Sequence, residues 1–437
     1  MLTDKTDIKS IFAQEALDLG GLLDAFSLPA STEFERDARL SLQLFSEKIH
    51  DDYFSLNKDS DEYLRMLYDN LHCDLLNNLD VNAFAFKSDK FYFIGINAGS
   101  LLVIQQAFFT LLSHPAVLQD IGNIANETPK FDSIPFGFPL TNKKLENISD
   151  ISPKDTVRWH YCLFLTSCAM RFLMLHELGH ILYGHIDYIA QIGARPLLSE
   201  IPQQDNSPFS SDTLQALEFQ ADMFASQIYA SQIDNPRSMN VLDFMLNRTS
   251  TLEEIIRGKL FAVGILFRLF AQNERRPREI SKNKLINYLY GKNTAGTIIE
   301  KGTHPRIKVR FNSCIYEMSY YMDKKKKKEI NDIFESISKT VLIEVEKVWS
   351  MLKLPGHPSI DRHNLASTEV CDESLLTLAN DLLVKKANAL SPIPSLRTSS
   401  ESNDSMSSRA AEVIKRLKED PKSKFLDTSV KKILDRL

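Results

Sequence analysis

The stretch FLMLHELGHILYGH, from Phe172 to His185, constrains the fold most strongly, because it places ionisable side chains within an apolar helical pattern. His176 and His180 are four residues apart, so on a helix both imidazoles lie on one face, close enough to share one tetrahedral ion. Glu177 lies beside such an ion, where it can accept a proton from a metal-bound water. A metal also offsets the free-energy cost of burying these side chains. The stretch therefore predicts a metal site on a buried helix.

Two neighbouring residues have other expected roles. His185 follows His180 by five residues, which on a continuous helix rotates its side chain about 140° away from the metal face. We therefore expect His185 to be structural and to lie near the mouth of the site. Gly179 lowers the helix propensity by about 1 kcal/mol relative to alanine, and its missing side chain is expected to leave room near the ion.

The segment ALEFQADMFASQIYA supplies a candidate for the third metal ligand. Glu218 and Asp222 are four residues apart and therefore share one helix face. Apolar residues surround them on nearly every side, which favours a buried helix over an amphipathic helix with two acids on its solvated side. We expect Glu218 to bind the metal, and Asp222 to accept the free N–H of a metal-bound histidine and so to fix its tautomer.

A third motif extends the pattern. The segment THPRIKVR contains His304, Pro305 and, six residues after the histidine, Arg310. Proline is common at the first helical position, so His304 and Pro305 also predict the start of a helix. Over residues 80–320, the motifs HELGH, EFQAD and HPRIKVR resemble in sequence and order the gluzincin metallopeptidases. The similarity is greatest to the family of CAAX-prenyl and heat-shock membrane proteases and their soluble relatives, whose N-A-F strand and following strand the segment NAFAFKSDKFYFIGINAGSL also resembles.

The resemblance implies a zincin fold and a zinc endopeptidase. Zn²⁺ would be bound by His176, His180 and Glu218, with a water in the fourth position. Glu177 would act as the general base, and His304 would stabilise the oxyanion. This chemistry is hydrolysis of a peptide bond by a metal-activated water.

The resemblance also suggests how the cleft is built. His304 and Arg310 would point into it, with Arg310 and Asp222 in the second shell of the metal. An edge strand near Asn82–Phe86 or Phe91–Ile96 would hold the backbone of a protein or peptide substrate by strand addition.

Two alternatives stay open from the sequence. A weaker resemblance, to phage-exclusion peptidases of the Lit type that cleave elongation factor Tu, suggests a defence peptidase acting on a host protein. A zinc-stabilised scaffold or sensor without catalytic activity would use the same histidines. Such a structural site has no use for a carboxylate placed as a base, and it closes the fourth metal position with a protein ligand.

Composition excludes several other classes. The net charge of −5 argues against a nucleic-acid binder, and the five scattered cysteines, none in a CxxC pair, favour a reducing compartment. The N-terminus shows no basic segment followed by an apolar run, so no signal peptide is expected. The apolar stretches Tyr161–Leu175 and Leu260–Phe270 are interrupted by Arg171 and Arg268 and fall short of the ~20 residues of a membrane span. We expect a cytoplasmic protein without transmembrane segments.

The expected fold class is α+β, mainly helical, with a small antiparallel sheet and the HExxH motif on a helix. A helix is expected from Ser60 to about Leu79, followed by a hairpin of Asn82–Phe86 and Phe91–Ile96. Further helices are expected at 100–112, 156–188, 212–232, 251–273 and 305–322, with a long irregular connection over 114–155. Thr251 and Glu254 form an expected capping box.

Changes in composition predict the domain organisation. The predicted parts are an N-terminal helical region (1–80), a metallopeptidase domain (81–322), a charged helical extension (323–390), a disordered Ser/Pro linker (391–409) and a basic amphipathic C-terminal helix (410–437). The C-terminal helix is a possible binding site for a partner protein.

The linker gives a first testable prediction. Ser391–Arg409 has too little apolar surface to offset the entropy of ordering it. Limited proteolysis should therefore cut there and leave a core that still binds zinc. Protection of the linker, or loss of zinc after it is trimmed, would contradict the predicted boundary.

Overall fold

The computed structural model describes residues 5–23, 70–78, 80–127, 151–191, 197–199, 211–233, 242–243, 246, 248–274, 307–325 and 327–351. Several expected features lie wholly or partly outside these ranges. They are His304 with Pro305, the linker at 391–409, the C-terminal helix at 410–437, the middle of the connection over 114–155, residues 60–69 of the first expected helix and residues 352–390 of the charged extension.

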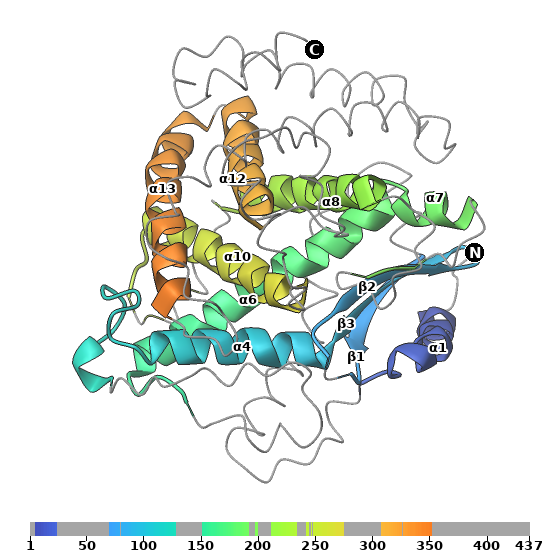
Figure 1. Ribbon diagram of the computed structural model, residues 1–437, viewed down its shortest axis with the longest axis horizontal. Coiled ribbons are helices and arrows are strands. Elements are labelled where there is room, and N and C mark those ends of the chain that lie inside the picture. The colour runs from blue at the N-terminus through green and yellow to red at the C-terminus, as the bar shows by residue number, and fades with distance from the viewer. Residues whose placement is uncertain are drawn as a thin grey trace, which may run out of the picture.

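Helices dominate the described chain, and a small sheet lies at one end of them (Figure 1). This confirms the mainly helical α+β class. The helices are α1 (Lys5–Glu15), α4 (Ala98–Leu112), α6 (Thr156–Leu182), α7 (His185–Gln191), α8 (Ser211–Ser231), α10 (Leu252–Glu274), α12 (Ile307–Lys324) and α13 (Lys328–Met351), with 3₁₀ turns at Leu17–Leu19 and Ile124–Asn126. The strands are β1 (Leu71–Leu76), β2 (Ala83–Ser88), β3 (Phe91–Asn97) and β4 (Leu197–Ser199).

The sheet has the order β1-β3-β2-β4 and is mixed. The expected hairpin is confirmed, since β2 and β3 pair antiparallel, but β1 pairs parallel with β3, so the purely antiparallel sheet was wrong. The helix expected from Ser60 to about Leu79 was wrong over Leu71–Leu76, because these residues form β1. Leu71, Cys73 and Leu75 belong to the main core, whereas His72 lies against Phe12 of α1 on the other face. Side chains that alternate between the two faces at every second residue are typical of a strand and not of a helix.

The sheet is buried on both faces. Small and aliphatic side chains of one face join the main core with α4 and α6, whereas aromatic side chains of the other face form a second cluster with α1. This second cluster contains Phe12 from α1 and Phe84, Phe86, Phe91 and Phe93 from the hairpin. The sheet therefore lies between α1 and the helical body, as Figure 1 shows.

The strand pairing changes the expected substrate edge. β3 lies between β1 and β2, so Phe91–Ile96 cannot accept another strand. β2 is paired with β3 on one side and with β4 on the other at Phe84–Phe86. The strand-addition site was expected at one of the two hairpin segments, but other strands of this chain already pair with β3 and with Phe84–Phe86 of β2. The outer strands of the sheet are β1 and β4.

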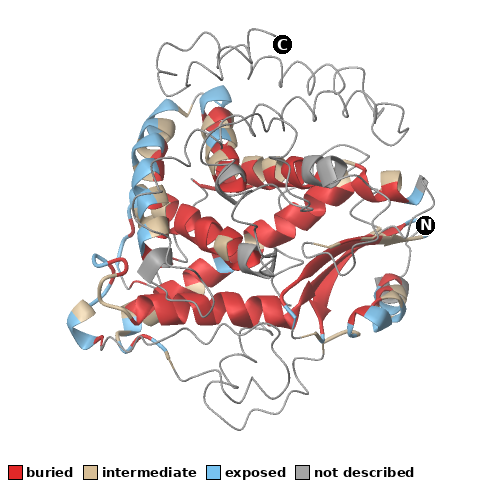
Figure 2. Ribbon diagram, viewed as in Figure 1, coloured by how far each residue is buried: buried red, intermediate tan, exposed pale blue. Residues whose placement is uncertain are grey.

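α6 is the central helix of the core. Asp155 caps its N-terminus by accepting a hydrogen bond from the backbone N–H of Arg158. The helix packs against α4, α8 and α10 and is buried along most of its length (Figure 2). Within the described part of the chain it alone has the length and composition of a membrane span, but 83% of that apolar window is buried. The continuous helix expected over 156–188 was wrong beyond Leu182, because Gly184 takes a φ of 71° and α7 begins as a separate helix.

The later helices follow the sequence pattern closely. The expected helix at 212–232 is α8, that at 251–273 is α10 and that at 305–322 is α12. The capping box is confirmed, because Thr251 N–H donates to Glu254 and Glu254 N–H donates to the Thr251 hydroxyl. α13, which begins the charged extension, packs against α10 and contributes Val345 and Val348 to the same core. Its outer side is exposed (Figure 2).

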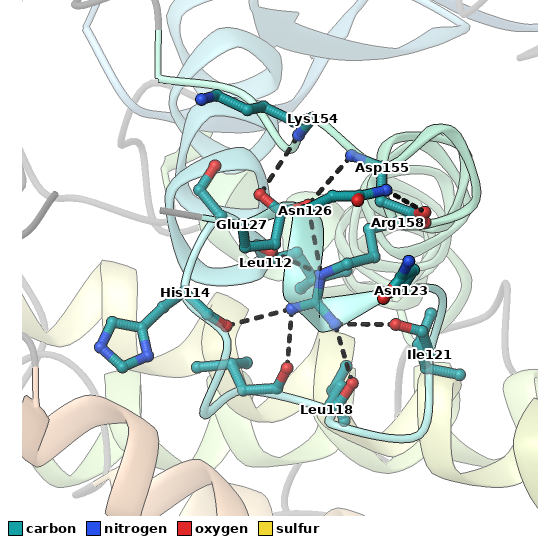
Figure 3. Close-up of polar contacts among 12 residues, drawn as sticks. Leu112, His114, Leu118, Ile121, Asn123, Asn126, Glu127, Lys154, Asp155 and Arg158 are labelled. Carbon is teal, nitrogen blue, oxygen red and sulfur yellow. Dashed lines mark hydrogen bonds and ion pairs between the residues drawn. The ribbon is translucent and has the colours of Figure 1, made fainter. Parts of the chain in front are cut away.

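A buried arginine organises the start of the connection between α4 and α6. The Arg158 side chain is fully buried and donates five hydrogen bonds to backbone carbonyls (Figure 3). The acceptors are the carbonyl oxygens of Leu112, His114, Val117, Leu118 and Ile121, at 2.7–3.1 Å. Glu127 Oε1 lies 3.8 Å from Arg158 Nε and balances its charge. The Arg158 side chain thus donates to backbone carbonyl groups that no hydrogen bond of a helix or a strand satisfies.

Arg158→Met should lower the free energy of unfolding by about 3–5 kcal/mol, because it leaves the carbonyls and the charge of Glu127 buried without their partner. Urea unfolding followed by circular dichroism measures this change. The matched control is Arg248→Met, because Arg248 is 47% exposed and pairs with Glu254 on the surface, where such a pair contributes at most about 1 kcal/mol. Equal effects of the two substitutions would contradict the role of Arg158.

Candidate metal centre

The candidate site lies where α6 packs closely against α8. A Cβ atom at Gly179 would lie 3.0 Å from Ala221 Cα and 3.3 Å from Phe224 Cβ. Gly179 therefore faces the backbone of α8 and allows the two helices to approach. The expectation that it leaves room near an ion was wrong, because the space beside it is filled by α8.

Three side chains from these two helices converge. His176 Nε2 lies 3.1 Å from His180 Nε2 and 3.1 Å from Glu218 Oε2, and His180 Nε2 lies 3.6 Å from Glu218 Oε1. All three residues are at most 3% exposed. His176, His180 and Glu218 thus form a buried group that could bind a metal ion.

The spacing of these atoms suits a small tetrahedral ion. Zinc–ligand distances of about 2.0–2.1 Å place two donor atoms of a tetrahedron about 3.3 Å apart. The separations of 3.1 to 3.6 Å between the three donors lie on both sides of this value. Two imidazole nitrogens and one carboxylate oxygen are also a donor set that zinc favours.

A carboxylate and an arginine stand behind His176. Asp222 Oδ1 lies 2.9 Å from His176 Nδ1. Arg310 of α12 donates to both oxygens of Asp222, at 2.7 and 2.9 Å, and its guanidinium lies 4.7 Å from the ring centre of Phe267. Because Asp222 is held as an acceptor, His176 donates its Nδ1–H and directs the lone pair of Nε2 toward Glu218. Arg310 is 3% exposed and lies against Asp222.

A different pair of side chains stands behind His180. His185 Nδ1 lies 2.9 Å from His180 Nδ1, and His185 Nε2 lies 2.8 Å from the side-chain oxygen of Gln220. His185 is completely buried, so the expectation that it lies near the mouth of the site was wrong. Burial, together with the nearby imidazole of His180, lowers the pKa of His185 to about 3, and the ring is therefore neutral near pH 7.

Glu177 lies on the buried part of α6 and is 1% exposed. Burial raises the pKa of the Cys73 thiol in β1, and the charges of Asp74 and Glu177 raise it further. The structure thus brings together His176, His180, Glu218, Asp222 and Arg310. Glu177 is next to His176 in the sequence, and His304 lies outside the described ranges.

Gln220 and the contact of His185 were missed from the sequence. The motif GH at Gly184 and His185 contained a usable signal, because a glycine after a helix often ends it in the left-handed conformation. An imidazole after such a stop can fold back toward the helix that it follows. Gln220 offered no signal, since its role depends on where α7 begins.

In comparisons with known proteins, no family model, no curated protein and no solved structure matches this chain. The resemblance to gluzincins therefore depends on the sequence motifs alone.

Gly179→Val should separate α6 from α8 and weaken metal binding, because the branched side chain meets the α8 backbone at Ala221. Overpacking of this kind costs about 1–3 kcal/mol in the free energy of unfolding. Chelator competition and urea unfolding measure both effects. Ser167→Val, on the exposed face of the same helix, is the matched control and should change neither quantity by a comparable amount. Unchanged zinc affinity in Gly179→Val would show that the close helix contact does not set the site.

Proposed function

We propose that the protein is a zinc-dependent endopeptidase of the gluzincin type, with a zincin fold. The observation that carries this proposal is the group of three buried ligands, His176, His180 and Glu218, with Glu177 next to the first of them. Catalytic zinc sites have three protein ligands and keep the fourth position for water, whereas structural sites use four protein ligands. Within the described ranges, three residues form the group.

The surrounding side chains support three ligands instead of four. The Nδ1 of His185 contacts the Nδ1 edge of His180, away from the Nε2 of His180, and the Nε2 of His185 bonds Gln220. Asp222 is engaged with His176 and Arg310. Neither side chain is placed to complete a tetrahedron around the converging donor atoms.

Each residue of the site then has a chemical task. When bound, zinc lowers the pKa of a coordinated water to about 7 and polarises the carbonyl group of the substrate. Glu177 accepts the proton of the attacking water and delivers it to the nitrogen of the leaving amine. Asp222 and Arg310 hold His176 in the tautomer that presents Nε2. His304, by its resemblance to the family motif, would stabilise the oxyanion.

The expected substrate is a protein or peptide, and we propose a cytoplasmic enzyme. Cleavage of a host protein, as in the Lit-type phage-exclusion peptidases, is one form that this activity could take. The pairing of β2 with β4 bears on how a substrate binds, because an extended peptide could reach β2 at Phe84–Phe86 only after β4 leaves it. A substrate strand would otherwise add to β4 itself.

A zinc-stabilised scaffold or sensor is the second candidate, and one observation favours it. The ligands and Glu177 are almost completely buried, as structural zinc sites commonly are. The two candidates differ in the task of Glu177, because only the peptidase requires a base beside the metal.

Glu177→Gln therefore separates them. The amide cannot accept a proton, so this variant should retain fold and zinc but lose peptide hydrolysis by about 10²–10⁴-fold. A proteome-wide search for new peptide ends in lysate of the host, comparing wild type with Glu177→Gln, identifies the substrate and measures the loss.

Glu218→Ala is the control for the metal, since it removes one ligand and should reduce zinc content measured by elemental analysis. Equal cleavage by wild type and Glu177→Gln would show that Glu177 is not the base. A wild-type protein that binds zinc stoichiometrically but cleaves nothing would favour the scaffold.

A further inference from the structure

The two histidine ligands of the candidate site have unequal partners. His176 is backed by a carboxylate that an arginine neutralises, Asp222 with Arg310. His180 is backed by a second imidazole and an amide, His185 with Gln220. A histidine that binds zinc through one nitrogen commonly donates its other N–H to a carboxylate, a carbonyl or a water, so an imidazole in this place requires an explanation.

The hydrogen bonds at His185 fix the direction of each donor. The side-chain oxygen of Gln220 accepts, so the Nε2 of His185 carries the hydrogen and donates it. A neutral imidazole carries one hydrogen, so the Nδ1 of His185 is an acceptor. The Nδ1 of His180, 2.9 Å away, must then donate, which leaves the Nε2 of His180 as a bare lone pair directed at the other two ligands.

We propose that His185 is a positioning residue, which fixes His180 in the tautomer that binds zinc by accepting its Nδ1–H and is itself oriented by Gln220. This proposal rests on the zinc site of the proposed function and adds two residues to it. Gln220 lies on α8 between Glu218 and Asp222. One helix thus supplies a metal ligand, the acceptor behind one histidine and the amide that orients the support of the other.

The fold holds His185 in this place. Gly184, with a φ of 71°, ends the preceding segment and lets α7 turn back toward α6. Asp187, two residues later, accepts hydrogen bonds from the Lys87 ammonium at 2.6 Å and from the Tyr92 hydroxyl at 2.9 Å. These bonds fix α7 to β2 and β3, and they hold the backbone that carries His185 beside α6.

The geometry also argues against His185 as a direct ligand. Its Nδ1 approaches the Nδ1 edge of His180, whereas the donors of the metal group meet at the Nε2 edge. The other nitrogen of His185 is directed at Gln220. Neither nitrogen is therefore directed at the position where the three ligands converge.

The test compares two substitutions of His185 in the full-length protein. His185→Phe fills the volume but offers no acceptor, and it should weaken zinc binding by about 10–100-fold in competition with a chelator. In His185→Asn the amide oxygen occupies nearly the position of Nδ1 and can still accept from His180, so most of the affinity should return. Gln220→Leu should weaken binding in the same direction, because it releases the tautomer of His185.

Two measurements separate positioning from mere packing and from direct ligation. The melting temperature of the zinc-free proteins reports packing, and the absorption spectrum with Co²⁺ in place of zinc reports the number of ligands, which should stay the same in His185→Phe. His160→Phe is the matched control, because His160 lies 16 residues before His176 on the same helix, about 24 Å along its axis. It should leave the zinc affinity unchanged.

Three results would overturn the proposal. Equal affinity of wild type and His185→Phe would remove any role of His185, and equal losses in the Phe and Asn variants would reduce that role to packing. A Co²⁺ spectrum showing one ligand fewer in His185→Phe would make His185 a ligand. These results leave the proposed peptidase standing, since wild type would still bind zinc, whereas a wild-type protein without zinc affinity would overturn both proposals.

Discussion

The contact between α6 and α8 at Gly179 is the constraint on which the rest of the site depends. Gly179 allows Ala221 to approach so closely that an added Cβ atom would touch its Cα. At this separation, side chains one turn apart on each helix meet, and His176 and His180 reach Glu218. A wider separation would keep the helices and the core but would move the carboxylate away from the imidazoles. The site is therefore a consequence of helix packing.

Close packing forces ionisable groups into the core, and their burial must be compensated. An isolated buried charge costs several kcal/mol, and breaking a buried ion pair by removing one partner costs about 3–5 kcal/mol. Asp222 is fully buried, and two hydrogen bonds from Arg310 neutralise it. His185 avoids the cost differently, because burial lowers its pKa and keeps the ring neutral. The buried support of His176 is therefore a charged pair, Asp222 with Arg310, whereas the buried support of His180 is the neutral ring of His185.

Much of this arrangement could be predicted from the sequence, because it depends on local periods. The spacing of His176 and His180, and that of Glu218 and Asp222, follow directly from the helical turn. Periodic helices such as α8 and α10 were predicted to within a residue or two for the same reason. The short segments were harder. β1 was mistaken for helix, because its alternation covers only a few residues and its partner β3 lies 15 or more residues away in the chain.

The predictions that failed at the site have two physical causes, a local end of a helix and contact between elements far apart in the sequence. The position expected for His185, near the mouth of the site, assumed that the helix continued, whereas Gly184 ends it. Gly179 was expected to leave room near an ion, and only the packing of α6 against α8 shows that this space is filled. A single sequence shows which residues can meet along one helix but not how two helices are oriented.

The side chains that support His176 and His180 connect these histidines to different parts of the fold. Behind His176 the chain of contacts continues through Asp222 and Arg310 to α12. Behind His180 it continues through His185 to α7, which Asp187 fixes to the sheet. The two histidines of α6 are thus supported from different elements, His176 through α12 and His180 through α7 and the sheet. Because both lie on α6, one helix joins these two sets of contacts at the candidate site.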